Sequence, residues 1–583
     1  MKLSRLLYLL PFAALLISGC NFNKQNRQEE NQQTSDTPDS QQDTDNPDEE
    51  VDDEPTIYEK DEQGFYILEE NYFSYTENQS DTKTKNEVCV PKDEQSVSKY
   101  SQLRMFIGDK QVPVYNVKTN MSQTWAGDAP NRQNNSYATI GLEGKVTIKL
   151  QASFSFLNQV TIRPSNRNVP FTIDSNRRVL TFTISDIGQY VIEMRSHRTL
   201  HLFVEDVSRM SNSDNSVIYF APGIHKHSND NRIGSNNIIN LSSNQKVFIA
   251  PGAFIYGKFM ANNASNIEIT GPGYIDGSIF ERDANKGSVL VPIEFNYCSN
   301  ITLKDFACVD PAGWCFNMYF CNGVTMDNVK VISSRSNGDG ISLQSCQNVT
   351  VTNSFVRSWD DSLVVKNYPQ WSNRDNEGIT RHISFENCVL WTDLAQSMEI
   401  GYETVGQVME DITFDNITVL HNFHKAVISI HNGNNANITD VHFKNITIED
   451  ASVGKGDGSP YVVDIRNVFS SNWSTNHKTT SLGSIDGIEV KNVKVIDGIE
   501  NPVILVKGTL ETRDIYPKVG HYTNNVSFTD FYLYDKVIDK TNCNYQTNEY
   551  TNNITFSSSG NPVTGASYNA IDVSAYGENI IFS

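Results

Sequence analysis

The octet Val349-Thr350-Val351-Thr352-Asn353-Ser354-Phe355-Val356 is one of eight copies of a single pattern. In every copy the first and third residues are apolar, and the fifth is Asn or Asp. The copies are residues 301–308, 324–331, 349–356, 383–390, 412–419, 441–448, 488–495 and 526–533. They recur at intervals of 23 to 47 residues because loops of different length separate them. A unit of this size that returns along a chain is typical of a solenoid of stacked turns.

The pattern predicts a parallel β-helix. Apolar residues at alternate positions indicate strands, and each turn buries its apolar face only by stacking on its neighbours. The recurring Asn predicts a tight corner, because Asn tolerates the left-handed backbone and its amide can bond to the next amide along the stack. The Leu-x-x-Leu-x-Leu pattern of a leucine-rich horseshoe is absent. We therefore predict an all-β protein in which residues 208–583 form a right-handed parallel β-helix.

The chain ahead of the repeats reads as a separate β domain. Residues 146–150 and 180–184 alternate apolar and polar side chains, and turn residues recur every 8–12 positions. This pattern predicts an N-terminal antiparallel β-sandwich over residues 57–207, which ends before the loop at 211–215. Titratable residues do not cluster in it, so we expect this domain to pack or to present substrate.

The first 56 residues read as an export leader and a tether. Residues 1–20 have a basic start, an apolar run and the sequence Ile17-Ser18-Gly19-Cys20, which resembles a bacterial lipobox and predicts a lipoprotein signal peptide. Lipid on Cys20 implies a protein held at the bacterial cell surface or outer membrane. The alternative is a plain signal peptide with an incidental cysteine. Residues 21–56 carry twelve acidic side chains, and this composition predicts a disordered linker.

Composition limits the partners of the folded part. Residues 29–54 carry twelve acidic and no basic side chains, and removing their −12 from the formal net charge of −22 leaves about −10, which argues against nucleic acid as a partner. Six of the nine cysteines fall between Cys298 and Cys388 and none forms a C-x-x-C pair, so we expect no metal site and buried thiols, with disulfides, which the sequence does not pair, as the alternative. We also expect no cofactor and a monomeric protein.

Three aspartates mark the candidate catalytic site. Asp339 lies in the turn sequence Asn337-Gly338-Asp339-Gly340, and Asp360-Asp361 follows 21 residues after Asp339. Residues one turn apart lie on neighbouring strands about 4.8 Å apart, so the three carboxyl groups should form one patch. Crowding raises the pKa of at least one of them, and a protonated acid beside ionised partners suits cleavage of a glycosidic bond.

Each motif alone has a simpler explanation, since Asn-Gly-Asp-Gly is a common turn and Asp-Asp is often a solvated corner. The spacing of one turn favours the catalytic interpretation. On a flat strand Asp360 and Asp361 would point to opposite sides, so we expect a bend or bulge where they lie.

Aromatic and polar residues around the aspartates predict a sugar-binding surface. Four of the six tryptophans fall within 78 residues, and aromatic rings stack on the apolar faces of sugars. They are Trp314, Trp359, Trp371 and Trp391. For Trp314 and Trp391 a place in the interior of the β-helix is an equal alternative.

Three residues near the aspartates complete the predicted site. Lys366 is expected to hold a substrate hydroxyl or to tune the aspartates rather than to be a surface charge. Glu399 and Tyr402, one turn further on, are candidates for a subsite, with a purely structural role as the alternative.

The motif Asn-x-Asp-Gly, followed one turn later by Asp-Asp and then Lys366, resembles the clan of polygalacturonases (family 28) and dextranases (family 49). The resemblance implies an inverting hydrolase with Asp360 as the proton donor and Asp339 and Asp361 as the groups that activate water. The Gly-His-Gly and Arg-Ile-Lys motifs of polygalacturonases are absent from residues 396–431, which counts against a polyuronate substrate. The preceding sandwich and the run Lys366-Asn367-Tyr368 look more like the dextranase branch.

We therefore expect the β-helix to be the catalytic domain of an endo-acting inverting glycoside hydrolase on a neutral α-glucan such as dextran. A polygalacturonase-like hydrolase of pectic polysaccharide is the first alternative. A polysaccharide lyase fits paired acids less well, because lyases need a base of near-neutral pKa. A non-catalytic glycan-binding β-helix is the alternative outside enzymes.

The leader sequence gives the first testable prediction. Replacing Cys20 with Ser should release the protein from the membrane fraction, because it removes the sulfur that would carry lipid. Fractionation of cells that express the natural and the Cys20→Ser chains measures this. Equal membrane association of both chains would contradict the anchor.

Overall fold

The computed structural model describes residues 58–69, 71–74, 86–120, 124, 132–282, 290–367, 378–468, 482–510, 519–560 and 580–582. In these residues the chain is built from strands, with two 3-10 helices, η1 (Ser165–Arg167) and η2 (Val207–Arg209). This confirms the predicted all-β class. Over the same ranges no helix has the length and apolar character needed to cross a bilayer. The signal peptide with Cys20, the linker and Trp371 lie outside the described residues.

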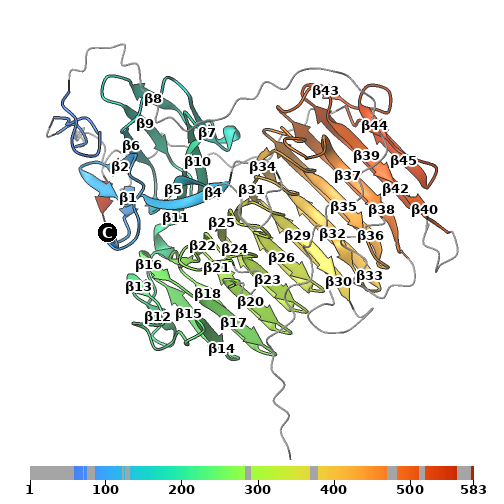
Figure 1. Ribbon diagram of the computed structural model, residues 1–583, viewed down its shortest axis with the longest axis horizontal. Helices are drawn as coiled ribbons and strands as arrows, with labels where there is room; N and C mark the ends of the chain where they lie inside the picture. Colours follow the sequence, from blue (N-terminus) through green and yellow to red (C-terminus); the bar gives the residue numbers. More distant parts are fainter. Residues whose placement is uncertain are drawn as a thin grey trace, which may run out of the picture.

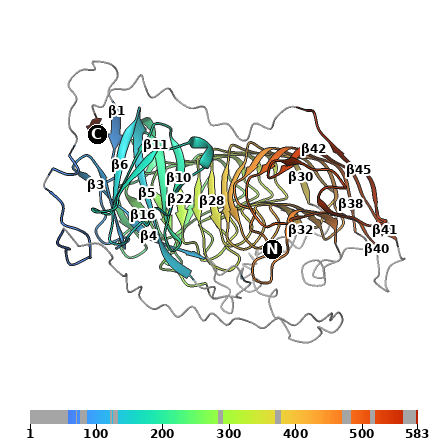
Figure 2. The same cartoon turned by 90° about the horizontal axis from the view of Figure 1, so that it is seen from above.

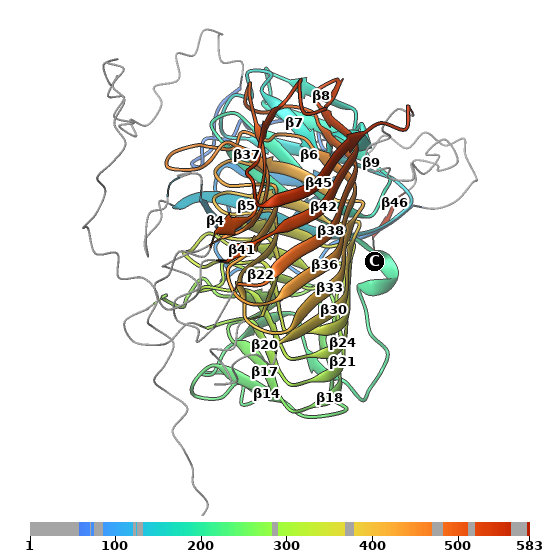
Figure 3. The same ribbon diagram turned by 90° about the vertical axis from the view of Figure 1, so that its right-hand side faces the viewer.

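The second domain is the predicted right-handed parallel β-helix, and most of its turns contribute three strands to three faces (Figure 1). The octet face carries the first part of each octet. It consists of β12 (Ile218–Phe220), β15 (Lys246–Ile249), β18 (Ser265–Thr270), β21 (Ser299–Lys304), β24 (Asn322–Asp327), β27 (Gln347–Thr352), β30 (Ile379–Glu386), β33 (Val408–Asp415), β36 (Asn437–Ile448), β38 (Ser484–Val495), β42 (Thr523–Leu533) and β45 (Thr551–Ser557). Figure 3 shows these strands as one continuous stack.

The second face, called here the junction face, follows the octet corner. It consists of β13 (Gly223–His225), β16 (Ala253–Ile255), β19 (Tyr274–Asp276), β22 (Ala307–Val309), β25 (Lys330–Ile332), β28 (Phe355–Ser358), β31 (Val389–Thr392) and β34 (Thr418–Asn422). The later strands β36 and β38 are long enough to span both faces.

The third face is an 11-stranded sheet. It consists of β14 (Ile238–Leu241), β17 (Lys258–Asn262), β20 (Ile293–Asn296), β23 (Phe316–Tyr319), β26 (Ile341–Gln344), β29 (Leu363–Asn367), β32 (Met398–Thr404), β35 (Ile428–Asn432), β37 (Tyr461–Asn467), β39 (Val503–Lys507) and β44 (Asn544–Gln546). Two short ribbons, β40 (Thr509–Leu510) with β41 (Gly520–His521) and β43 (Lys536–Val537) on β42, complete the domain.

The register of the stack matches the octets. Val349 pairs with Val324 on one side and with Ile383 on the other, so the first positions of successive octets lie directly above one another. Like residues therefore stack in the core; the rings of Phe385 and Phe414 are nearly parallel with centroids 4.9 Å apart. The cysteines between Cys298 and Cys388 are buried free thiols in this domain, as predicted.

The predicted corner is present at the fifth octet position. All eight residues there have a positive φ, between 53° and 73°. Side-chain amides join successive corners: Asn387 donates to Asn353 at 2.5 Å and Asn416 donates to Asn387 at 3.2 Å. This row of linked corner residues, which we call the corner ladder, fixes the direction in which the chain turns from the octet face to the junction face.

A second corner, which the sequence analysis missed, precedes each octet. Asn300, Asn348 and Asp411 have positive φ there, and Asn300 donates to Asn266 at 3.2 Å. Its residue type varies and includes Gly323 and His382, so no single repeated letter marks it.

The first domain is the predicted sandwich, with two sheets around one apolar core. The sheets contain β1 (Asn86–Cys89), β2 (Leu103–Ile107), β3 (Lys110–Val112), β4 (Tyr115–Asn120), β5 (Arg132–Glu143), β6 (Val146–Ala152), β7 (Val160–Arg163), β8 (Phe171–Asp174), β9 (Val179–Ile184), β10 (Gly188–Met194), β11 (Arg198–Asp206) and β46 (Ile580–Phe582). Most pairs are antiparallel, but β5 with β11 and β1 with β46 are parallel. The sandwich is therefore not purely antiparallel.

The predicted boundaries need one correction. Strand β46, near the end of the chain, belongs to the sandwich and not to the β-helix, because it pairs with β1. It covers the edge of β1, and such unpaired edges are prone to associate with other chains. The β-helix therefore does not extend through residue 583.

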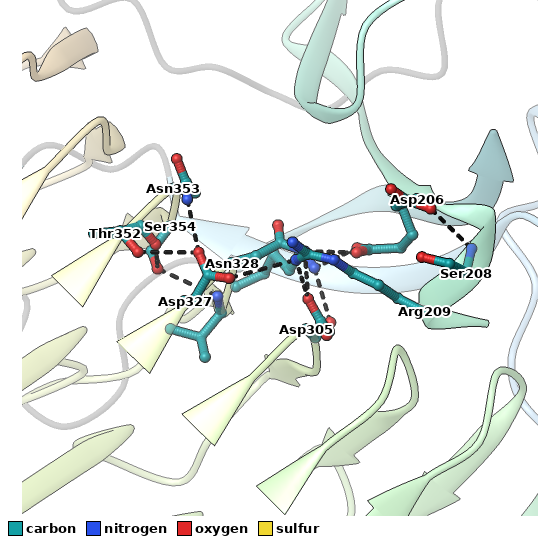
Figure 4. A network of polar contacts seen from close by, with 12 residues as sticks. Asp206, Ser208, Arg209, Asp305, Asp327, Asn328, Thr352, Asn353 and Ser354 are labelled. Carbon is teal, nitrogen blue, oxygen red and sulfur yellow. Dashed lines mark hydrogen bonds and ion pairs between the residues drawn. The ribbon is translucent and has the colours of Figure 1, made fainter. Parts of the chain in front are cut away.

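The sandwich packs on the junction face, where Tyr115, Phe203, Phe355 and Trp391 share one apolar cluster (Figures 1 and 2). A polar network lies beside this cluster (Figure 4). In it the corner residue Asn328 donates to Glu205 of the sandwich at 2.6 Å and to Asp305 at 2.9 Å. The corner ladder of the β-helix thus also holds the sandwich in place.

This arrangement predicts different costs for two corner residues. Asn328→Ala should lower the free energy of unfolding by about 2–4 kcal/mol. It leaves the buried carboxylates of Glu205 and Asp305 without this hydrogen-bond donor, and it places Ala at a positive φ. Asn387→Ala, at a half-buried corner away from the network, should lower it by about 1–2 kcal/mol.

Thermal and urea unfolding of both variants measures this difference. The matched controls are Asn328→Gly and Asn387→Gly, which tolerate the positive φ and so report only the lost side-chain bonds. Equal losses at the two corners would contradict a docking role for Asn328.

Candidate active site

The three aspartates lie at the corner between the junction face and the 11-stranded sheet. Asp339 precedes β26, while Asp360 and Asp361 lie between β28 and β29. Because Ile341 pairs with Leu363, Asp339 and Asp361 hold equivalent positions one turn apart. The amide of Gly340 donates to the carbonyl of Asp361 at 2.8 Å. The bend that we expected at Asp360 and Asp361 is therefore a corner between two strands. Because neither residue lies within a strand, their side chains do not have to point to opposite sides of a sheet.

All three carboxyl groups are buried, with 2% of Asp339, 7% of Asp360 and 8% of Asp361 exposed. Burial raises the pKa of each, because a charged carboxylate loses its hydration. Burial and the charge of Asp339 raise the pKa of Asp360 to about 7. Burial and the charge of Asp360 raise the pKa of Asp361. The cluster therefore retains protons at a pH at which exposed aspartates are ionised.

Lys366 on β29 places a cation inside this acidic cluster. Its Nζ lies 3.3 Å from Oδ2 of Asp339 and 3.8 Å from Oδ2 of Asp361. Burial alone would lower the pKa of Lys366, but the surrounding carboxylates raise it well above its usual value. No ion pair of Asp360 with Lys366 is found among the described residues. The charge of Lys366 therefore favours the ionised form of each aspartate, with direct ion pairs to Asp339 and Asp361, and Lys366 is no surface charge.

A chain of buried hydroxyl groups supports the aspartate turn from behind. Its links span 2.6–2.8 Å. In order, the chain runs through Ser358, Ser362, Thr392, Ser397 and Asn422. Ser358 also donates to the carbonyl of Asp360 at 2.6 Å, and the amide of Gln396 donates to Oδ1 of Asp361 at 3.2 Å. Small hydroxyl residues recurring beside the acids were the sequence signal for this support.

The structure separates the predicted tryptophans. Trp314 is partly exposed. Phe316 pairs with Ile341 on the next turn, and Trp314 and Asp339 each lie two residues before these partners. Trp314 therefore lies one turn from Asp339, at the same corner. Trp359 is fully buried, so its ring offers no face to a sugar and its predicted place on the sugar-binding surface is wrong. Neither alternative for Trp391, a groove position or the interior of the β-helix, is found. Its ring lies against the sandwich, 3.9 Å from the Arg357 guanidinium, and donates to Asp393.

Glu399 and Tyr402 occupy the 11-stranded sheet beyond the acids. Glu399 is fully buried and bonds to Ser429 and His431, so it does not line an open subsite. Tyr402 is partly exposed, and its ring lies flat on the His431 ring with centroids 4.2 Å apart.

Two further charged residues belong to the site and were missed from the sequence. Arg282 donates to Asn337 of the turn motif, and its positive charge opposes the rise in the pKa of Asp360. Glu403 approaches Lys366 with its Oε2 3.7 Å from Nζ. Arg282 comes from an earlier turn, and Glu403 lies where the register is broken, so neither has a fixed spacing from the motif.

Residues 235–515 match the family described as Glycosyl hydrolases family 28. The β-helix contains a glycosyl hydrolase family 28 domain. The matched residues include every aspartate of the cluster, Lys366 and Glu403. This confirms the resemblance to the clan of polygalacturonases and dextranases.

Similar proteins come from both branches of that clan. The chain is 30% identical to a polygalacturonase of Brassica napus over 77 residues, which cover 13% of this chain and 19% of the relative. It is 30% identical to a dextranase of Talaromyces minioluteus over 84 residues, which cover 14% of each chain. These alignments therefore span less than a fifth of either relative. The solved structure of Dex49A from Penicillium minioluteum superposes with a TM-score of 0.49 at 13% identity, covering 80% of this chain and 96% of that chain.

The raised pKa of Asp360 gives a prediction that needs no substrate. In the unfolded chain this group titrates near 3.8 and in the folded chain near 7, so the fold loses stability as the pH rises through this interval. Above about pH 7 Asp360 is ionised in both states, so the loss of stability that its ionisation causes no longer changes with pH. Asp360→Asn should therefore raise the stability at pH 8 by about 2–4 kcal/mol and have little effect at pH 4.

Melting temperatures at pH 4, 6 and 8 measure this effect. Asp535→Asn, at an exposed turn, is the matched control and should not change the pH dependence. A stabilisation of Asp360→Asn that is the same at all three pH values would contradict the raised pKa.

Proposed function

We propose that this protein is an inverting glycoside hydrolase that cleaves a polysaccharide. The observation that carries the proposal is the buried carboxyl cluster, in which Asp360 keeps a proton while the Lys366 ammonium holds Asp339. An acid that is protonated near neutral pH and a nearby base are the two groups that hydrolysis of a glycosidic bond requires. The family 28 domain over the same residues supports this assignment.

In the proposed mechanism Asp360 donates its proton to the glycosidic oxygen as the bond to the anomeric carbon breaks. Asp339 and Asp361 together take a proton from a water molecule that attacks the opposite face of the sugar. Lys366 lies nearer to Asp339 than to Asp361, so Asp339 is the first of the two to ionise. The attack from the opposite face inverts the anomeric configuration.

The substrate that we propose is a neutral α-glucan such as dextran, cleaved internally. A polyuronate needs cations that are free to bind its carboxylates. Beyond the acids, His431 lies between Glu399 and Asp464, and Arg466 is paired with Asp464 at 3.0 Å. These cations are balanced by neighbouring acids, which supports the neutral substrate. A pectic polysaccharide is the second candidate, favoured by the family 28 domain.

The leader sequence supports a location for this activity. We propose that the protein acts at the bacterial cell surface, held by lipid on Cys20 and extended from the membrane by the acidic linker.

Replacement of each aspartate tests the mechanism. Asp339→Asn, Asp360→Asn and Asp361→Asn should each lower kcat by roughly 10²–10⁴-fold without unfolding the protein. Asp360→Asn should recover activity on aryl glycosides with good leaving groups, because these need no proton. The two base variants should not recover.

The reaction is followed by release of reducing ends from a panel of dextran, other α-glucans and polygalacturonate, with NMR detection of the first anomer formed. Asp327→Asn on the octet face serves as the control variant. A retained anomer, or full activity of Asp360→Asn, would refute the proposed mechanism. Activity on polygalacturonate alone would assign the second candidate substrate.

A further inference from the structure

The 11-stranded sheet breaks its register next to Lys366. Val365 pairs with Ile400, but Asn367 pairs with Thr404, so β32 places three residues opposite the single residue Lys366. They are Gly401, Tyr402 and Glu403. A bulge of this kind redirects side chains that a regular strand would hold in register. Here it brings the Glu403 carboxylate to 3.7 Å from the Lys366 ammonium.

Glycine is required at the start of the bulge. Gly401 has a φ of 122°, and a Cβ atom at this position would lie 2.1 Å from the carbonyl oxygen of His431. At the other end, the hydroxyl of Thr404 donates to Oδ1 of Asn432 at 2.6 Å, and the backbone amide of Thr404 donates to Oδ1 of Asn434 at 3.1 Å. The bulge is therefore fixed at both ends.

A buried cation fixes the middle of the bulge. The ring of Tyr402 stacks on His431 at an interplanar angle of 3°. Nδ1 of His431 lies 2.8 Å from Glu399, and Nε2 lies 3.0 Å from Asp464. Burial alone would lower the pKa of His431, but these two carboxylates raise it to about 9. Tyr402 therefore rests on an imidazolium whose orientation is set by two acids.

We infer that Glu403 is a positioning residue for the proposed hydrolysis: it shares the Lys366 ammonium with Asp339 and Asp361, and the Tyr402–His431 stack holds it there. Glu403 needs no contact with substrate for this role. Its charge acts on the bases of the reaction through Lys366. The inference rests on the proposed function for its catalytic meaning, but the contacts of Glu403 are independent of it.

The charged groups around Lys366 determine the direction of the effect. They come from the corner before β26, the corner before β29, the β32 strand and the segment before residue 283. They are Asp339, Asp360, Asp361, Glu399, Glu403 and Arg282. Burial is the largest cause of the raised pKa of Asp339, Lys366 opposes it, and Glu403 raises it further.

Removal of the Glu403 charge should therefore lower the pKa of Asp339, and it also leaves Lys366 free to pair more closely with that residue. As Asp339 is the proposed base, the acid limb of the pH profile of kcat/KM should move to lower pH. Among the described residues Glu403 makes no ion pair with Asp360, and it is not among the largest influences on the pKa of Asp360, so the basic limb should stay in place.

The test compares Glu403→Gln with the natural protein over pH 4 to 9. We expect the acid limb of kcat/KM to move down by about one pH unit, with the basic limb unchanged. Tyr402→Leu, which removes the stack but keeps Glu403, should move the acid limb in the same direction. Glu410→Gln is the control, because Glu410 lies on the octet face and pairs with Arg381 at 3.1 Å; it should move neither limb.

A second measurement needs no turnover. In protein labelled with 13C at the aspartate carboxyl carbons, the Asp339 signal is identified by its loss in Asp339→Asn, and its titration should move to lower pH in Glu403→Gln. This result holds even if no glycan is cleaved, so it separates this inference from the proposed function. An unchanged Asp339 titration, or an equal shift of both limbs, would overturn the role of Glu403.

Discussion

In-register stacking of parallel turns is the constraint on which this structure depends. Each residue lies above its counterpart of the previous turn, at the spacing of hydrogen-bonded strands. The same geometry stacks Val349 on Val324, Phe414 on Phe385 and Asn387 on Asn353. It also stacks Asp361 on Asp339, where the outcome is unfavourable for the fold. In-register stacking, which stabilises apolar and amide side chains, thus concentrates negative charge where the stacked residue is aspartate.

The corner is a suitable place for that concentration because its backbone is already fixed. Hydroxyl groups of Ser358, Ser362 and Thr392 hold the turn from inside, and Lys366 supplies one positive charge from the adjacent strand. Burial raises the pKa values of these acids, and the charge of one cation does not return them to the ordinary range. The electrostatic strain is local, while the long apolar core on either side of the turn provides the stability to tolerate it.

Features that follow the repeat were predictable from the sequence, and features that interrupt it were not. The octets, the corner at Asn353 and the meeting of Asp339 with Asp361 all follow from one spacing. Trp391 was placed wrongly because its partner, the sandwich, is far away in the sequence and no periodicity reports a contact between domains. Glu403 was missed because the bulge in β32 changes the register by two residues, and spacing arguments fail where register is lost.

The pairing of β1 with β46 has a consequence for how the protein is made. Asn86 lies opposite Ile580, so the first sheet of the chain lacks its outermost strand until β46 has been synthesised, after all the turns of the β-helix. The β-helix can stack turn by turn as it emerges, since each turn needs only its predecessor. Until β46 has been synthesised, the edge of β1 in the sandwich stays unpaired, and its pairing with β46 is a long-range contact of the kind that slows folding. Closure of the sandwich by β46 therefore follows synthesis of the β-helix.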